Sequence, residues 1–356
     1  MINLSSNYPS AAGQEELTRR YMRDVLADPA LNLSAPRPYF GHPTDVESVR
    51  TALVGPQTGI PGTRCALTCS GQAALAAALA TVCVRPGLRF VAESWTFPKF
   101  IRALSFFGAS ATPVQMDDYG IVPDSLERVC AQGRLDALYT MPTFHNPLGT
   151  VMPVDRCEAI AAIVRRHNLW VIEDNAYAFL ESNAPPNIRF FAPERTLQVF
   201  SLSKMISLGL RLGALILPET IAARSADYID VAGIPAHPLA TATAASIVRD
   251  GQLPALAEAK RAEGVARFEM ARGILGERVK SVHPHGWHIL LATPNNIPGT
   301  RFVERARIDA NVTISAAAAY RLDGRDEPMV RVSFGGESDR AVLTAGIRRL
   351  AGLFAR

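Results

Sequence analysis

The chain has 356 residues with a formal net charge of +4; 48% of its residues are hydrophobic and 20% are charged. This length is typical of two domains, and the apolar content excludes a highly charged disordered chain. The small net charge gives no reason to expect a nucleic acid or a membrane as partner. The first ten residues show no leader pattern, and no apolar run is long enough to span a membrane. We therefore expect a cytoplasmic protein.

The cysteines form no CxxC pair and lie in apolar or helical stretches of the sequence. They are Cys65, Cys69, Cys83, Cys130 and Cys157. We interpret them as buried small hydrophobic residues in a reducing compartment. No further ligands accompany the first two at a usable spacing, so we expect no metal site.

A polar, proline-containing stretch over residues 1–40 predicts an arm and one helix. Short apolar strands then alternate with helices through the first two thirds of the chain. The predicted strands are residues 65–69, 89–92, 112–115, 137–141, 169–173 and 197–202, and the predicted helices are 71–84, 99–107, 124–132 and 154–167. Alternation of this kind, with strands that are continuously apolar, predicts an α/β fold with a mostly parallel sheet between helices.

The pattern changes after residue 218. Helical patterns over residues 236–276 are followed by predicted strands at 287–292 and 329–334 and by a last helix at 338–354. We therefore predict a large domain over residues 41–235. Residues 1–40 and 236–356 are predicted to form an arm and a smaller α+β domain.

Lys204 directly follows a predicted strand that ends in Ser201 and Ser203, and Arg211 stands between two nearby glycines. An amine held at the end of a rigid strand can form an imine with an aldehyde cofactor, and hydroxyls with a guanidinium suit a bound phosphate. The chain has only four lysines, so a lysine in this motif is less expected by chance. Taken alone, the segment is also compatible with a surface turn.

Three other segments place polar residues at the ends of predicted strands. Asn146 lies in an Asn-Pro-Leu-Gly loop, where α/β sheets build their ligand crevice, although such a loop can be a plain turn. Asp174 could keep a heterocyclic nitrogen protonated or cap a helix. Ser70 could cap a helix, and the first amides of that helix could bind phosphate.

Together and in this order, these segments resemble the class I/II aminotransferase family of enzymes that depend on pyridoxal 5′-phosphate (PLP), which have the aspartate aminotransferase-like fold type I. The resemblance extends from about residue 40 to the C-terminus. The family motifs S-x-S-K, G-x-R-x-G, N-P-x-G and D-x-x-Y stand here as Ser201, Ser203, Lys204, Gly209, Arg211, Gly213, Asn146, Pro147, Gly149, Asp174 and Tyr177.

The resemblance implies a role for each matching residue. Lys204 is the implied Schiff-base lysine and proton shuttle, Asp174 the partner of the pyridine nitrogen, and Tyr177 with Asn146 the donors to the phenolic oxygen. Arg331, with Asn146, is the implied ligand of the substrate α-carboxylate. The implied phosphate ligands are Ser70, Gly71, Gln72, Ser201, Ser203 and Arg211.

Some positions leave alternatives. Phe97 stands where the family commonly has a tyrosine that stacks on the cofactor ring, and Trp95 is close enough in sequence to take that place. In the family, a tyrosine near this position reaches the neighbouring subunit. Tyr39 is only a weak match to it, because Thr44 stands where a glycine is usual. The histidines at positions 283, 285 and 288 could face substrate, or be surface or satisfied core residues.

The resemblance implies a homodimeric PLP enzyme, with active sites at the dimer interface, that moves the amino group of an L-amino acid to a 2-oxo acid. The same residues would serve a PLP-dependent lyase, decarboxylase, cyclase or oxidase, because substrate orientation decides which bond breaks. Some transcription regulators join this fold to a basic helix-turn-helix domain of roughly sixty residues or more. Residues 1–40 show no such pattern, so we favour the enzyme; the sequence leaves donor, acceptor and pathway open.

Overall fold

The computed structural model describes residues 1–31, 42–54, 62–280 and 283–354. Its main sheet consists of β2 (Thr63–Thr68), β3 (Arg89–Glu93), β4 (Ser110–Val114), β7 (Ala137–Thr140), β8 (Trp170–Asp174), β9 (Thr196–Phe200) and β10 (Gly213–Pro218). The seven strands follow the order β2-β10-β9-β8-β7-β3-β4, and β10 alone is antiparallel to its neighbours. The predicted α/β class with a mostly parallel sheet is confirmed.

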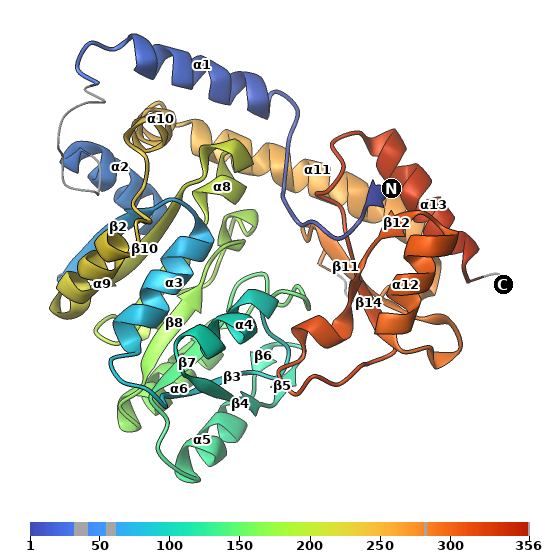
Figure 1. Cartoon of the computed structure of the whole chain (residues 1–356), viewed down its shortest axis with the longest axis horizontal. Coiled ribbons are helices and arrows are strands. Elements are labelled where there is room, and N and C mark those ends of the chain that lie inside the picture. Colours follow the sequence, from blue (N-terminus) through green and yellow to red (C-terminus); the bar gives the residue numbers. More distant parts are fainter. Residues whose placement is uncertain (32–41, 55–61, 281–282, 355–356) are drawn as a thin grey trace.

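Helices cover both faces of this sheet (Figure 1). One face packs against α3 (Gly71–Val82), α4 (Pro98–Phe106) and α9 (Glu219–Val231). The other packs against α1 (Gln14–Ala27), α2 (Pro43–Val54), α5 (Pro123–Ala131), α6 (Val154–Arg166), α7 (Ile188–Phe191) and α10 (Pro238–Arg249). Coverage on both sides explains why the strands are apolar throughout rather than alternating.

Successive residues of a strand enter different apolar clusters, because their side chains point to opposite faces of the sheet. In β10, Leu215 and Leu217 join the cluster around α3, whereas Ala214 and Ile216 join the cluster around α10. All four are almost completely buried. The antiparallel strand therefore helps to hold the two helical layers together.

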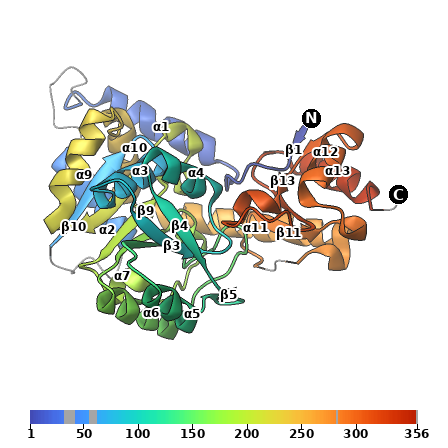
Figure 2. The ribbon, with the colours of Figure 1, turned by 60° about the horizontal axis from the view of Figure 1, so that its bottom comes forward.

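The C-terminal part has its own sheet, in the order β11-β14-β13, and lies to one side of the main sheet (Figure 2). Its elements are α11 (Gln252–Leu275), β11 (His288–Ala292), α12 (Gly299–Asp309), β12 (Val312–Thr313), β13 (Ser315–Ala316), β14 (Met329–Ser333) and α13 (Arg340–Gly352). The N-terminal strand β1 (Ile2–Asn3) pairs in parallel with β12. The first residues of the chain thus pack with its C-terminal part, which begins at α11.

Several smaller elements complete the fold. They are the hairpin β5 (Met116–Asp117) and β6 (Gly120–Ile121), the helix α8 (Leu202–Met205), and the 3₁₀ turns η2 (Ala178–Leu180), η3 (Leu208–Leu210), η4 (Gly276–Arg278), η5 (Pro294–Asn296) and η6 (Ala317–Tyr320). The sequence predicts no element for residues 213–218, 219–231 or 299–309, which form β10, α9 and α12.

The cysteines agree only partly with the expectation of burial. All five are free thiols; Cys130 and Cys157 are buried, but Cys65, Cys69 and Cys83 are only half-buried. No helix in the described part of the chain has both the length and the apolar character needed to cross a membrane.

Leu215→Ala tests the packing of β10 between the two helical layers. The leucine is completely buried, so truncation leaves a cavity and should lower the free energy of unfolding by about 2–5 kcal/mol. Val231→Ala is the control, because Val231 is 89% exposed and its truncation should change stability by about 0.5 kcal/mol or less. Urea unfolding measures both, and equal losses would contradict the packing argument.

Candidate active site

A cavity of about 390 Å³ lies at the carboxyl ends of the parallel strands, where α/β sheets place their ligands. Its lining includes all twelve predicted site residues: Ser70, Gly71, Gln72, Phe97, Asn146, Asp174, Tyr177, Ser201, Ser203, Lys204, Arg211 and Arg331. They come from segments far apart in the sequence, which the sheet topology brings together. Tyr39 lies outside the described residues.

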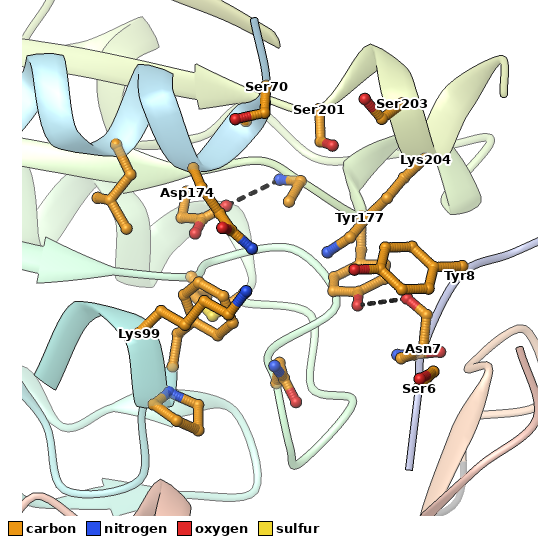
Figure 3. A pocket seen from close by; sticks show the side chains of 18 of the residues that line it. Ser6, Asn7, Tyr8, Ser70, Lys99, Asp174, Tyr177, Ser201, Ser203 and Lys204 are labelled. Atoms are coloured by element: carbon orange, nitrogen blue, oxygen red, sulfur yellow. Dashed lines mark hydrogen bonds between the residues drawn. The ribbon is translucent and has the colours of Figure 1, made fainter. Parts of the chain in front are cut away.

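Lys204 lies on the short helix α8, which follows β9, and extends into the cavity opposite Lys99 (Figure 3). Its Nζ lies 3.6 Å from the centroid of the Tyr177 ring, and no residue in the described ranges accepts a hydrogen bond from it. Burial lowers the pKa of Lys204 to about 8, although the nearby charge of Asp174 acts in the opposite direction. The site therefore holds an unpaired and partly deprotonated amine.

Asp174 ends β8 and is only 3% exposed. Its Oδ2 accepts a hydrogen bond from the Tyr139 hydroxyl at 2.8 Å, and its Oδ1 accepts one from the Ala176 amide at 3.0 Å. Burial raises the pKa of Asp174, while the charge of Lys204 and the hydroxyl of Tyr139 lower it. Two donors and a nearby cation thus fix the orientation of this carboxyl group.

Tyr139 contacts Asp174 in the site, and no motif in the sequence indicates this contact. It belongs to β7, within an apolar run, and lies 35 positions before its partner Asp174. The one available signal was that a buried tyrosine hydroxyl usually needs a hydrogen-bond partner. Its ring also stacks on Phe100 with the centroids 3.9 Å apart, so both ends of the side chain are held.

The start of α3 forms one wall of the cavity. Ser70 caps the helix by accepting a hydrogen bond from the Ala73 amide at 3.1 Å, so the Gly71 and Gln72 amides keep no helical partner. A Cβ on Gly71 would lie 2.9 Å from the Ser201 Cβ, which shows how closely the two segments approach. These free amides at the positive end of a helix suit an anion.

The Ser203 side chain is hydrogen-bonded to the backbone of Leu212, the residue after Arg211. The Ser203 hydroxyl donates to the Leu212 carbonyl at 3.1 Å and lies 3.0 Å from the Leu212 amide, so it fastens α8 to the start of β10. Arg211 has a positive φ of 51° just before this contact. The hydroxyl predicted to bind phosphate therefore also fixes the backbone beside the arginine.

Arg331 on β14 faces the cavity and is 6% exposed. Its Nη1 donates to Asn146 Oδ1 at 2.8 Å, and its Nη2 donates to the Ser5 carbonyl at 2.7 Å. Its Nε is buried and has no partner within the described residues. The guanidinium thus keeps one buried donor that no acceptor among the described residues satisfies.

The N-terminal arm contributes to the site more than the sequence indicated. Residues 5–8 line the cavity, and the Tyr177 hydroxyl donates to the Asn7 carbonyl at 3.1 Å (Figure 3). The Asn7 side chain also contacts His288 Nδ1 at 3.0 Å. No local motif marked these contacts, because they join positions at opposite ends of the chain.

Of the two candidate aromatic residues, only Phe97 lines the cavity. Trp95 packs against Arg321, whose guanidinium lies 5.1 Å from the indole centroid. Three residues of α4 that were not predicted also line the cavity, namely Pro98 and the two cationic residues Lys99 and Arg102. Burial lowers the pKa of Lys99, and the charges of Lys204, Arg211 and Arg102 lower it further.

His288 is a satisfied core residue, which decides between the two interpretations left open for it. Its Nε2 donates to the Pro147 carbonyl at 2.9 Å, and its Nδ1 accepts from the Asn7 amide. Burial lowers its pKa from 6.5 to about 3, and the charge of Arg331 lowers it as well. His283 and His285 lie near Glu181, outside the cavity lining.

A family model described as aminotransferase class I and II matches residues 1–321. The chain belongs to this family.

Similar proteins include both enzymes and a regulator. The uncharacterized HTH-type transcriptional regulator YdeF of Bacillus subtilis is 30% identical over 267 residues, covering 74% of this chain and 57% of that protein. The mitochondrial kynurenine/alpha-aminoadipate aminotransferase of Bos taurus is 28% identical over 186 residues, covering 48% and 43%. The chain spans about half the length of these curated relatives.

Solved structures of aminotransferases share the whole fold. The Pyrococcus horikoshii kynurenine aminotransferase, determined in complex with PMP, has a TM-score of 0.88 and 21% identity to this chain. The alignment covers 100% of this chain and 91% of that one. At this identity the likeness establishes the fold, and the activity has to be argued from the site.

His288→Gln tests the buried histidine that joins the arm to the residue 145–149 loop. Because folding lowers the pKa of His288 from 6.5 to about 3, the unfolded chain binds an extra proton between these values. The free energy of unfolding should therefore fall as pH decreases below 6.5, by up to about 1.4 kcal/mol per pH unit. Between pH 7 and pH 5, the wild type should lose about 2 kcal/mol more than the variant in urea unfolding. Parallel losses would show that His288 becomes protonated without unfolding.

Proposed function

We propose that the chain is a PLP-dependent aminotransferase that moves the amino group of an L-amino acid to a 2-oxo acid. The observation that carries this proposal is the desolvated Lys204 amine, which extends into a cavity between Asp174 and the free amides at the start of α3. An amine that forms an imine with an aldehyde must be partly deprotonated, and burial of Lys204 produces this state.

The residues present fit PLP at both ends. The Gly71 and Gln72 amides, the Ser201 hydroxyl and the Arg211 guanidinium offer donors for a phosphate, and all four line the cavity. The Asp174 carboxyl, held by Tyr139 and Ala176, offers an acceptor for a ring nitrogen. Phe97 offers an aromatic face to the ring. When bound, PLP supplies an electron sink that stabilises negative charge at the α-carbon of an amino acid.

The chain's own residues then divide the remaining tasks. With a pKa of about 8, roughly a tenth of the Lys204 amine is neutral at pH 7, so it can take up a proton at its Nζ. Arg331 and Asn146 hold the substrate α-carboxylate through charge-assisted hydrogen bonds. Tyr177 lies against Lys204, and the arm residues 5–8 cover the cavity on the Tyr177 side and limit the access of water.

Two other classes of function remain as alternatives. A PLP-dependent lyase, decarboxylase, cyclase or oxidase would use the same residues, and the aminotransferases among the relatives support transamination instead. The second alternative is a regulator domain that senses PLP or an amino acid, and the similarity to the Bacillus subtilis regulator is the observation that suggests it. Turnover separates the classes, since a sensor binds the ligands without releasing a 2-oxo acid.

We also propose that two copies of the chain form a homodimer with the cavities near their interface. The support is the resemblance to the family and the position of two exposed cations, Lys99 and Arg102, at the cavity. Sedimentation equilibrium of the purified chain tests this, and a monomer under conditions of full activity would contradict it.

Lys204→Ala tests the proposed function. With PLP added, the wild type should show a visible absorption band that changes with an amino acid and returns with a 2-oxo acid, and it should release the 2-oxo acid of the donor. Lys204→Ala should lose this band and reduce turnover by at least about 10³-fold, because the covalent step is lost. Lys280→Ala, which removes an exposed lysine, is the control and should behave as wild type. Equal turnover in Lys204→Ala would exclude the assignment.

Arg331→Lys tests the proposed carboxylate contact. A lysine keeps the charge but loses the planar fork, so the KM for the amino acid should rise roughly 10-fold or more. Because the contact binds substrate before and during the reaction, kcat should change less. Arg325→Lys is the control, since the Arg325 side chain is 75% exposed and forms an ion pair with Asp323, away from the cavity lining. An unchanged KM in Arg331→Lys would place the carboxylate elsewhere.

A further inference from the structure

Lys260 is a completely buried lysine on the long helix α11, behind the cavity rather than in it. Its Nζ donates to three backbone carbonyls: those of Lys204 at 2.7 Å, Met205 at 2.9 Å and Ile206 at 3.2 Å. An ammonium group has three N–H donors, so these contacts use all of them. One of the three acceptors is the backbone of Lys204 itself.

These carbonyls lie at the C-terminal end of α8, the helix of four residues that carries Lys204. The last carbonyls of a helix have no partner within it, and a cation there satisfies them and complements the helix dipole. Burial lowers the pKa of Lys260 to about 7, while its carbonyl acceptors favour the protonated form. Such a short helix has little stability of its own, so an outside contact has a large effect on it.

The same lysine is joined to the sheet that carries Arg331. The Lys260 carbonyl accepts a hydrogen bond from Trp287 Nε1 at 3.2 Å. The Trp287 carbonyl in turn accepts one from the Phe334 amide at 2.8 Å, just after β14. Trp287 is fully buried, and a Cβ on Gly264 would lie 3.0 Å from its Nε1, so this connection is closely packed.

We propose that Lys260 is a positioning residue: it fixes the backbone of Lys204 and links it to the strand that holds Arg331. The amine that reacts with the cofactor and the guanidinium that binds substrate are thereby held by one connected set of buried hydrogen bonds. The catalytic consequence of this arrangement rests on the proposed function, whereas the positioning of Lys204 does not.

Lys260→Met tests the proposal, because methionine keeps an unbranched apolar side chain and removes the three donors. Arg267→Met is the matched control. Arg267 lies two turns further along α11, is 2% exposed, and donates to the carbonyls of Phe334, Glu337 and Ser338 at 2.6, 2.6 and 2.8 Å. The substitution removes the same kind of buried cation–carbonyl contact, together with the Arg267 ion pair to Glu263 and its contact with the Trp287 ring. It leaves the Lys260 contacts with the carbonyls of residues 204–206 in place, so it separates these contacts from the rest of the connection.

The first measurement is hydrogen–deuterium exchange of the full chain. The Met205 and Ile206 amides bond to the carbonyls of Ser201 and Leu202 within α8. In Lys260→Met, exchange over residues 202–206 should accelerate at least about 10-fold. In Arg267→Met, acceleration should occur around residues 334–338, with residues 202–206 as in wild type. Equal exchange over 202–206 in wild type and Lys260→Met would overturn the proposal.

The second measurement is the pH dependence of acetylation of Lys204 by acetic anhydride, read by mass spectrometry on the chain without added PLP. The wild-type midpoint should lie near 8, and in Lys260→Met it should move toward the ordinary lysine value of 10.5, because a loosened α8 admits water. Arg267→Met should keep the wild-type midpoint. A midpoint common to all three proteins would leave Lys260 with a stabilising role alone and overturn the proposal.

Turnover gives the third readout. Misplacement of a reacting group by about 1 Å can cost roughly 100-fold in rate, so kcat of Lys260→Met should fall about 10- to 100-fold while KM stays within about 2-fold. If the methionine variant does not fold, Lys260→Gln keeps amide donors and should show intermediate values in the first two measurements.

The failure of the two proposals can be told apart. If the wild type transfers no amino group, but Lys260→Met still changes exchange and acetylation at Lys204, the proposed function fails and the positioning role stands. If the wild type is active and Lys260→Met matches it in all three readouts, only the positioning role fails.

Discussion

The site depends on one electrostatic constraint: an amine and a carboxyl group are buried together in a cavity that offers them few other partners. Burial lowers the pKa of Lys204 and raises the pKa of Asp174, and each charge partly offsets the shift of the other. Removal of either group would leave the other without its nearby opposite charge. The surrounding hydrogen bonds from Tyr139 and Ala176, and the carbonyls held by Lys260, keep this pair in place.

Residues at strand ends could be predicted from the sequence, because the order of strands brings their carboxyl ends to one edge. Lys204, Asp174 and Asn146 each follow an apolar run within a recognisable motif, and Arg331 lies within one. The start of α3, which is predicted to bind phosphate, could also be located in the sequence, since a serine before an alanine-rich helix is a local signal. The alternation of strands and helices, together with the family resemblance, is enough to predict that these residues form one site.

Contacts between distant segments could not be predicted in the same way. Tyr139 meets Asp174 across 35 positions, Lys260 meets Lys204 across 56, and Tyr177 meets Asn7 across 170. No local pattern marks such pairs, because they result from how complete elements pack. The strand β10 was missed for a related reason. Its run begins at a glycine and ends at a proline, which are turn signals, and its pairing with β2 and β9 overrides them.

The uneven distribution of lysine has a practical consequence for the chemistry of the surface. Of four lysines, Lys204 reaches into the cavity, Lys260 is fully buried behind it, Lys99 lies at its wall, and only Lys280 is exposed away from it. Amine-directed dyes, cross-linkers and coated supports therefore have few sites of attachment, and one of them borders the cavity. Coupling through a thiol introduced away from the cavity would leave it clear, whereas coupling through amines would partly report on its accessibility. Arginine-directed reagents share this property of amine reagents, because Arg102 and Arg211 also line the cavity.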